Sequence, residues 1–192
     1  MARRYQLRAR AERRQDTRRR IVEAAVELHR TVGPARTEVS AIAELAGVER
    51  VTVYRHFPRQ AELLAACSQH FRALHPPPEP AQFRSIRDAR QRAAVALDAA
   101  FAYYEANQAM MANVLRDAAV MPVGQGFEMF QSSLAQTLEP GWSVRGRRAE
   151  RLHAALRLAV DFHAWQRLAR ELSRDGCVAV MLAMLEGVAG GG

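Results

Sequence analysis

The sequence contains no lysine, so all 28 of its basic side chains are arginines, and it has only two cysteines in 192 residues. Cys67 and Cys177 are far apart, and each lies in an apolar stretch with helical patterning. We therefore expect two buried thiols rather than a disulfide framework or a metal site. The chain is also rich in alanine, and we attribute the missing lysine to a bias of the coding DNA.

Long apolar runs are missing as well. No segment approaches the roughly 18 uninterrupted apolar residues that a membrane span requires, and no apolar segment follows the basic N-terminus as it does in a signal peptide. Glycine-rich phosphate loops, metal-binding motifs and nucleophile elbows do not occur either. We therefore expect a cytoplasmic protein that is not an enzyme, needs no cofactor and binds neither a metal nor a membrane.

The positive charge is concentrated at the N-terminal end. Residues 1–75 contain 15 arginines and 8 acidic residues, whereas residues 76–192 contain 13 arginines and 12 acidic residues. Nine of the arginines fall within the first twenty residues. Such an excess favours binding to a polyanion, because each phosphate contact releases counterions. Two interpretations of residues 1–14 stay open: an arm that enters a DNA minor groove, or a solvated disordered tail.

Residues 37–60 read TEVSAIAELAGVERVTVYRHFPRQ and have the pattern of a helix-turn-helix. In its first segment, apolar residues fall at the spacing of one buried helical face, and Gly47 suits the turn because glycine takes positive φ at little cost. In the second segment Val53 and Phe57 share a face and Pro58 ends the helix. The opposite, exposed side carries Val51, Thr52, Tyr54 and Arg55. An ordinary helical hairpin is the alternative for a motif of this length.

Helical patterns cover nearly all of the chain, which predicts an all-α fold. Thr17 is a plausible N-cap for the first helix, and later helices are expected at about 85–107, 108–120, 124–138, 147–173 and 177–188. A run of prolines after His75 marks the clearest boundary. The predicted organisation is a basic flexible arm 1–14, an N-terminal head 15–75 with the helix-turn-helix at about 38–57, a Pro-rich boundary 76–82, a C-terminal helical domain 83–188 and a flexible tail 189–192.

The last two predicted helices suggest a homodimer. The helix at 147–173 shows two apolar stripes, although one domain core needs a single face. The final helix is apolar nearly all round, which implies burial on every side. Both features favour a four-helix interface between two subunits, with a large monomer core as the alternative. The predicted interface residues are Leu152, Leu156, Ala159, Val180, Met181, Met184 and Leu185.

These residues together resemble the tetracycline-repressor (TetR) family of bacterial regulators. The resemblance covers about residues 16–75, and the region 165–188 also looks like the end of such proteins. It rests on motif positions Val39, Ile42, Ala43, Gly47, Val48, Thr52, Tyr54, His56 and Phe57. It implies a three-helix DNA-binding head followed by a helical domain that dimerises and binds a small-molecule effector.

The resemblance also implies where DNA is bound. Thr52 and Tyr54 are the expected phosphate contacts, and Arg50 and Arg55 are the expected base-reading side chains. His56 either contacts DNA or is wedged inside the head. Three positions depart from the family pattern, since Glu49 and Arg59 replace small capping residues and Gln60 replaces a lysine. The expected DNA-binding set is Ser40, Arg50, Val51, Thr52, Tyr54, Arg55, His56, Arg59 and Gln60.

The function implied by the resemblance is that of a ligand-responsive repressor. A homodimer would present two reading helices to half-sites of an approximately palindromic double-stranded operator, and an effector would favour a conformer that releases it. The expected effector-binding residues are Asp98, Phe101, Tyr104, Met111, Leu115, Phe127, Phe130, Phe162 and His163. The alternative function is a non-enzymatic interaction protein whose basic head binds an acidic partner.

Overall fold

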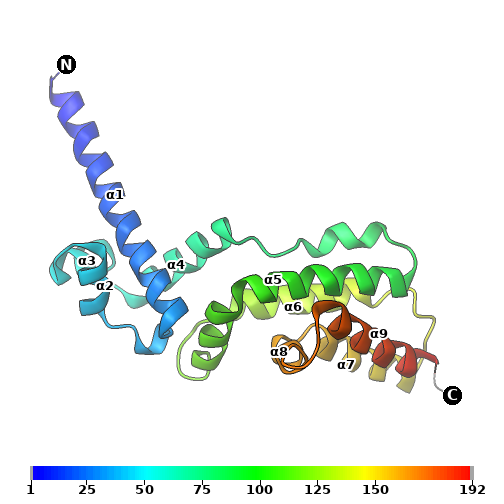
Figure 1. Ribbon diagram of the computed structural model, residues 1–192. Coiled ribbons are helices and arrows are strands. Elements are labelled where there is room, and N and C mark those ends of the chain that lie inside the picture. The colour runs from blue at the N-terminus through cyan, green and yellow to red at the C-terminus, as the bar shows by residue number, and fades with distance from the viewer. Residues whose placement is uncertain (1, 191–192) are drawn as a thin grey trace. The chain divides into compact units, whose positions relative to one another are not determined.

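The computed structural model describes residues 2–190, and among them it contains only helices and the loops that join them. The chain folds as two units (Figure 1). The first consists of the chain up to Pro76 together with Gln108–Val123. The second consists of Pro77–Asn107 and the chain from Gly124 onward.

The first unit is built on a long N-terminal helix that packs against the second and fourth α-helices (Figure 1). Its elements are α1 (Ala2–Thr31), η1 (Pro34–Arg36), α2 (Val39–Ala46), α3 (Arg50–His56) and α4 (Gln60–Leu74). Small and branched apolar side chains from all four α-helices fill the core: Ile21, Val22, Ala24, Ala25, Ile42, Ala43, Ala46, Val53, Phe57, Leu63 and Cys67. This head matches the one predicted from the apolar spacing.

Helix α1 begins much earlier than the sequence predicts. Residues 2–14, expected as a flexible arm, are helical. Thr17, expected as the N-cap, lies inside the helix, where its Oγ1 donates a hydrogen bond to the Arg13 carbonyl at 2.9 Å. A threonine can bond the preceding turn in this way, so its presence does not oblige a helix to start. Residue 1 of the predicted arm lies outside the described residues.

The segment after Asn107 belongs to the head, which corrects the predicted domain boundaries. Asn113 Nδ2 donates to the carbonyls of His29 at 3.2 Å and Arg30 at 2.7 Å, and Arg116 Nη2 donates to that of Val32 at 2.9 Å. These carbonyls lie at the end of α1, where a helix lacks internal partners. Asp117 Oδ2 accepts the Ala35 N–H at 2.9 Å at the start of η1. Residues distant in sequence thus pair the free backbone groups at the end of α1 and at the start of η1.

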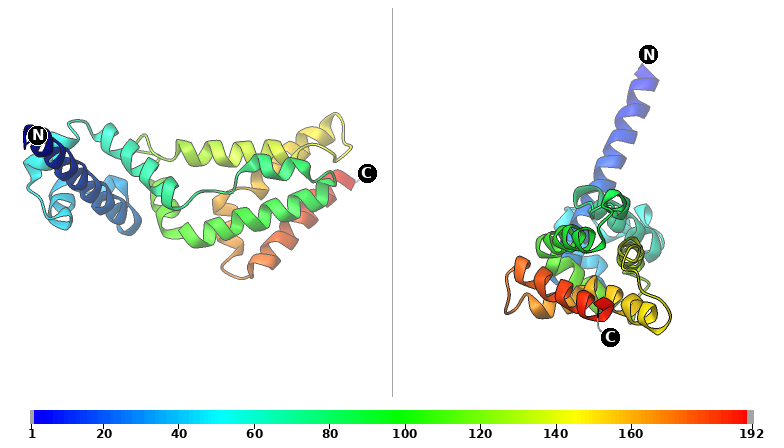
Figure 2. Two further views of the ribbon diagram at one scale, coloured as in Figure 1. Left: turned by 90° about the horizontal axis from the view of Figure 1, so that it is seen from above. Right: turned by 90° about the vertical axis from the view of Figure 1, so that its right-hand side faces the viewer.

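The second unit contains η2 (Pro80–Ser85), which packs on α6 (Figure 2), and the first part of a long helix, α5. The helix α5 (Ala89–Asp117) has non-helical angles at Asn107, φ −122° and ψ 15°, which is where the sequence predicts a division. The remaining helices are α6 (Gln125–Leu138), α7 (Arg147–Ala159), α8 (Phe162–Leu168) and α9 (Arg174–Gly190). The helix α7 packs against α9.

The helix predicted at 147–173 is broken into α7 and α8. The Val160 carbonyl at the break accepts hydrogen bonds from the Tyr104 hydroxyl at 2.7 Å and from Gln131 Nε2 at 2.8 Å. Asp161 then caps α8, because its Oδ1 accepts the Ala164 N–H at 2.8 Å. The carbonyl left free by the break is therefore paired, and the next helix begins with a favourable cap.

Most of the predicted dimer residues lie inside the second unit, which corrects that prediction. Five are buried within a single chain and present no surface to a partner: Leu152, Leu156, Ala159, Met181 and Leu185. Val180 is exposed and Met184 half-buried. The helix α9 is thus not buried on every side, because Val180, Ala183, Met184 and Gly187 form an apolar stripe at the surface.

The predicted flexible tail, residues 189–192, is described only in part. Residues 189 and 190 of the predicted flexible tail belong to α9, whereas 191 and 192 lie outside the described residues. Within the described part of the chain, no helix combines the length and apolar character needed to cross a bilayer.

Candidate nucleic-acid interface

The corner between α2 and α3 is set by one glycine. Gly47 has φ 63° and ψ 44°, the left-handed conformation that a residue with a Cβ adopts at a cost. Its N–H donates to the Glu44 carbonyl at 3.1 Å, and the Val48 N–H donates to that of Ala43 at 2.9 Å. This bonding satisfies the last carbonyls of α2 and turns the chain directly into α3.

Helix α3 has a buried and an exposed face, as the sequence predicts. Val53 and Phe57, its C-cap, are buried in the head. On the other side Val51 is 62% exposed and Tyr54 49% exposed, and Arg55 is exposed as well. Such large apolar and aromatic side chains at the surface, beside a guanidinium, are available to contact base edges and phosphates.

The other predicted DNA-binding residues flank this face. Arg50 is the exposed first residue of α3, and Gln60 is the exposed first residue of α4. The half-buried Ser40 on α2 donates from Oγ to Glu38 Oε2 at 3.0 Å. Arg59 is exposed but bonds Glu62 Oε1 through Nε at 2.8 Å and Nη2 at 2.5 Å. Neither Glu49 nor Arg59 makes a side-chain cap hydrogen bond, in keeping with the departures noted in the sequence.

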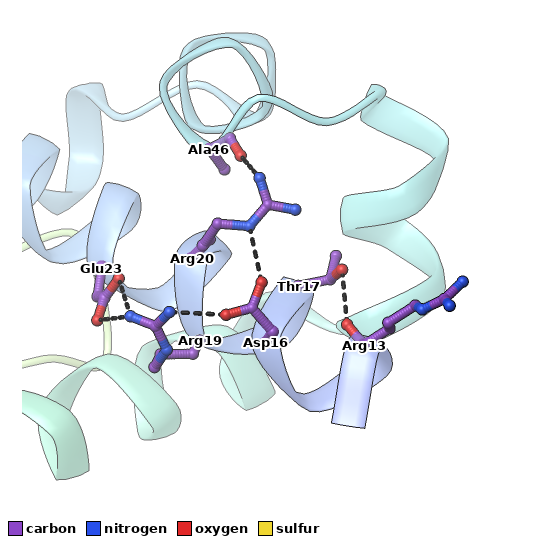
Figure 3. Close-up of polar contacts among 7 residues, drawn as sticks. All are labelled: Arg13, Asp16, Thr17, Arg19, Arg20, Glu23 and Ala46. Carbon is purple, nitrogen blue, oxygen red and sulfur yellow. Dashed lines mark hydrogen bonds and ion pairs between the residues drawn. The ribbon is translucent and has the colours of Figure 1, made fainter. Parts of the chain in front are cut away.

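Two arginines of α1 fasten the helix-turn-helix to the rest of the head. Arg20 Nη1 donates to the Ala46 carbonyl at the end of α2, at 2.9 Å, and Arg20 Nε lies 3.4 Å from Asp16 Oδ2 (Figure 3). Arg18 Nη1 donates to the His56 carbonyl at the end of α3, at 3.0 Å, and its guanidinium lies 4.0 Å from the centre of the Phe57 ring. Positive charge at a helix C-terminus is favourable, so both contacts orient the two helices.

The ion pairs of α1 do not include all of its arginines. Figure 3 shows Asp16 between Arg19 and Arg20, and Arg19 also pairs with Glu23 at 2.8 Å. Within the described part of the chain, Arg13 and Arg14 have no carboxylate partner. Together with side chains of the turn and of α3 they line one hollow, formed by Arg13, Arg14, Thr17, Val48, Glu49, Thr52, Arg55 and His56.

The contribution of α1 to this hollow is not apparent from the sequence, which places Arg13 and Arg14 in a flexible arm. The helical spacing of Arg13, Arg14 and Thr17 places them on neighbouring turns, but their position against α3 depends on the head's tertiary packing. The half-buried His56 lines the same hollow. Burial and the charges of Arg14, Arg55 and Arg18 lower the pKa of His56. The hollow therefore has a positive field that favours an anion.

Comparison with known proteins identifies this head. Residues 21–67, from α1 to α4, match the model of bacterial regulatory proteins of the tetR family. Over 61 residues the chain is 44% identical to the HTH-type transcriptional regulator TtgR of Pseudomonas putida. The head is therefore of the TetR type. The match with TtgR covers 32% of this chain and 29% of TtgR, less than a third of that relative's length.

Solved TetR-like structures share the fold over most of the chain. A TetR-like transcriptional regulator from Rhodococcus sp. RHA1 aligns with a TM-score of 0.61 and 18% identity, over 92% of this chain and 97% of that one. NalD, the secondary repressor of the MexAB-OprM multidrug efflux pump in Pseudomonas aeruginosa, aligns with a TM-score of 0.57 and 22% identity, over 89% and 95%. At such identities the likeness concerns the fold.

The predicted effector-binding residues divide between the two units. Met111 and Leu115 belong to the first unit with the head, so they do not join the others within one unit. In the second unit, Asp98 accepts a hydrogen bond from Arg174 Nε at 2.8 Å, and His163 is exposed. The aromatic members do come together, as one cluster of Phe101, Tyr104, Phe127, Phe130 and Phe162 that also includes Tyr103 and Trp165.

Proposed function

We propose that this protein is a ligand-responsive repressor that binds a palindromic DNA operator as a homodimer. The observation that carries the proposal is the exposed face of α3, where Val51, Tyr54 and Arg55 project from a short helix anchored by Val53 and Phe57. A helix of this kind enters a major groove with its side chains toward base edges. The unpaired Arg13 and Arg14 nearby add sequence-independent attraction to phosphates.

The dimer is supported by the apolar stripe of α9. Val180, Ala183, Met184 and Gly187 recur at the spacing of one helical face and remain at the surface, while Met181, Leu182 and Leu185 on the opposite side are buried. Burying this stripe against a second copy removes apolar surface from water. A two-fold symmetric dimer would present two α3 helices to half-sites about one DNA turn apart.

The names of the relatives support a regulatory role. TtgR is named a transcriptional regulator, and NalD is described as a repressor of a multidrug efflux pump. We infer repression and response to a small molecule from this likeness together with the aromatic cluster of the second unit. The effector would act by binding one of two conformers more tightly, which shifts the population away from the DNA-binding one.

An operator selection followed by a gel-shift titration tests the function. Purified protein is incubated with a random double-stranded library, and bound sequences are amplified and titrated at several salt concentrations. We expect an approximately palindromic site whose binding weakens as salt rises. The Arg55→Ala variant should lose discrimination among sites. Arg145→Ala removes an exposed arginine of the second unit and is the matched control. This variant should keep its discrimination among sites. Failure to enrich any sequence would contradict the proposal and favour an acidic protein as the partner.

A further inference from the structure

Trp165 carries a polar group that the fold of the second unit does not use. Its side chain is only 1% exposed, and its indole Nε1 has no hydrogen-bond partner within the described part of the chain. An indole N–H can only donate a hydrogen bond, so it cannot be satisfied by another donor. Buried polar groups are paired in the great majority of cases, and an exception calls for a physical explanation.

The surroundings of this N–H are aromatic. The centre of the Trp165 ring system lies 5.5 Å from the rings of Tyr104 and Phe162 and 6.4 Å from that of Phe101. The nearby polar groups are engaged with one another. The Tyr104 hydroxyl donates to the Val160 carbonyl, which also accepts from Gln131 Nε2. The cluster thus combines ring faces with one unused donor.

Three carboxylates of the same unit are already engaged. Asp98 and Glu105 accept hydrogen bonds from Arg174 at 2.8 and 3.0 Å, and Asp161 caps α8. The indole N–H needs an acceptor, and an anionic acceptor would be buried near the Asp161 carboxylate, whose charge acts on Tyr104, without an opposite charge. A flat apolar ligand with one uncharged acceptor would stack on the rings and also pair the indole N–H.

We propose that Trp165 Nε1 is the hydrogen-bond donor for the effector, and that the effector is an uncharged planar aromatic compound with a hydrogen-bond acceptor on its ring or directly attached to it. This inference rests on the proposed ligand response and names the chemical class of the ligand. Phe127 is the ring that the ligand displaces. It is half-buried, whereas the Tyr104 and Phe162 rings that it contacts at 5.7 and 6.2 Å are fully buried.

The second tryptophan supplies an internal control. Trp142 is half-buried in the same unit, and its Nε1 donates to the Leu138 carbonyl at 2.9 Å. The two indole N–H groups give two separate signals in a proton–nitrogen correlation spectrum. An acceptor-bearing ligand should therefore move the Trp165 signal downfield and leave the Trp142 signal in place.

Quinoline and naphthalene form a suitable pair of probes, because they have the same shape and differ by one acceptor nitrogen that is uncharged near neutral pH. Each is titrated into the full-length protein and into its Trp165→Phe and Trp142→Phe variants. In the unmodified protein we expect quinoline to bind about three- to tenfold more tightly than naphthalene, the range set by one net hydrogen bond. Trp165→Phe should reduce that ratio to about one, and Trp142→Phe should preserve it.

The inference is overturned if neither probe binds, if the two bind equally to the unmodified protein, or if the Trp165 signal does not shift downfield. Equal binding would mean that the indole N–H is held against a ring face and serves packing alone. The spectra of the unmodified protein decide the question even if Trp165→Phe does not fold. Because no DNA is used, failure here leaves the operator selection untouched, and failure of that selection leaves this binding result untouched.

Discussion

Individual side chains of α3 have separable roles in the proposed DNA complex. Arg55 presents a planar guanidinium at the surface, whereas Thr52 is half-buried and bonds the Arg55 side chain through Oγ1 at 3.3 Å. We predict that Arg55→Ala weakens binding to the selected operator by about 1–3 kcal/mol and relaxes the preference at one base pair. Thr52→Ala should weaken binding to all sequences alike. Titration against operators with single base-pair changes measures both effects.

Arg59→Ala is the control for this pair. The Arg59 guanidinium is exposed at the edge of the α3 surface but is bonded to Glu62. We therefore expect its removal to cause little loss of base discrimination. If Arg55→Ala and Thr52→Ala merely scale the affinity for every operator by one factor, the assignment of base and phosphate contacts is wrong.

His29 near the end of α1 makes the stability of the head depend on pH. It is 5% exposed, and burial lowers its pKa from 6.5 to about 4, although the carboxylate of Asp117 opposes that shift. As pH falls below 6.5 the unfolded chain takes up a proton that the folded chain does not. We therefore predict a loss of about 2 kcal/mol in unfolding free energy between pH 7 and pH 5, measured by urea denaturation.

The His29→Gln variant should reduce this dependence, because glutamine does not titrate, and the lowered pKa of His56 leaves a smaller slope of the same sign. Asp117 does not confuse the measurement. Burial alone would raise its pKa, but the Arg116 guanidinium and the Ala35 N–H stabilise the carboxylate and hold the pKa below 3.8. Its contribution is lost only at a lower pH than the window used. Equal slopes for the two proteins between pH 7 and pH 5 would contradict the assignment to His29.

At the scale of elements, α1 is more than a scaffold for the helix-turn-helix. Arg13 and Arg14 extend the positive hollow beside α3. We predict that replacing both with glutamine lowers the slope of log affinity against log salt by about 1.8 for each subunit, since each phosphate contact contributes about 0.9. Glutamine keeps helix propensity, so α1 should remain folded.

Arg30→Gln is the matched control for this change. Arg30 lies at the opposite end of α1 and is paired with Glu27 at 2.6 Å, so its loss should leave the salt slope unchanged. A slope that is also unchanged in the Arg13, Arg14 double variant would show that this part of α1 does not contact phosphates. Circular dichroism of both variants excludes a loss of helix as the cause.

The same elements show how far sequence patterns reach. The faces of α2 and α3, the Gly47 corner and the kink at Asn107 follow from local spacing and agree with the sequence-based expectation. The break between α7 and α8 does not, although Asp161 is a suitable cap, because the apolar periodicity continues across it. That break is stabilised by Tyr104 and Gln131, which reach Val160 from distant segments. The docking of Arg18 and Arg20 on helix ends likewise depends on tertiary packing.

At the scale of the whole molecule, the division into units does not follow the order of the chain. The first boundary between the units falls inside the proline run, between Pro76 and Pro77. The chain nevertheless returns to the first unit at Gln108 and leaves it again after Val123. The proline run marks the first boundary, but composition does not mark the return at Gln108, since the residues after it are as apolar as residues 89–107. The side chains that close the end of α1, Asn113 and Arg116, are polar residues whose partners are backbone carbonyls. Backbone acceptors leave no pattern in a sequence.

Assembly of two chains should depend on the exposed apolar stripe of α9. Val180, on the exposed stripe of α9, and Val95, on α5, are both 44% exposed, which makes them a matched pair. If α9 forms the dimer interface, Val180→Asp places two unpaired charges in it and should convert the protein to monomers in sedimentation experiments at micromolar concentration. The monomers should also bind the operator more weakly, since one head then contacts only one half-site. Val95→Asp should alter neither property. A Val180→Asp protein that remains dimeric would place the interface elsewhere on the chain.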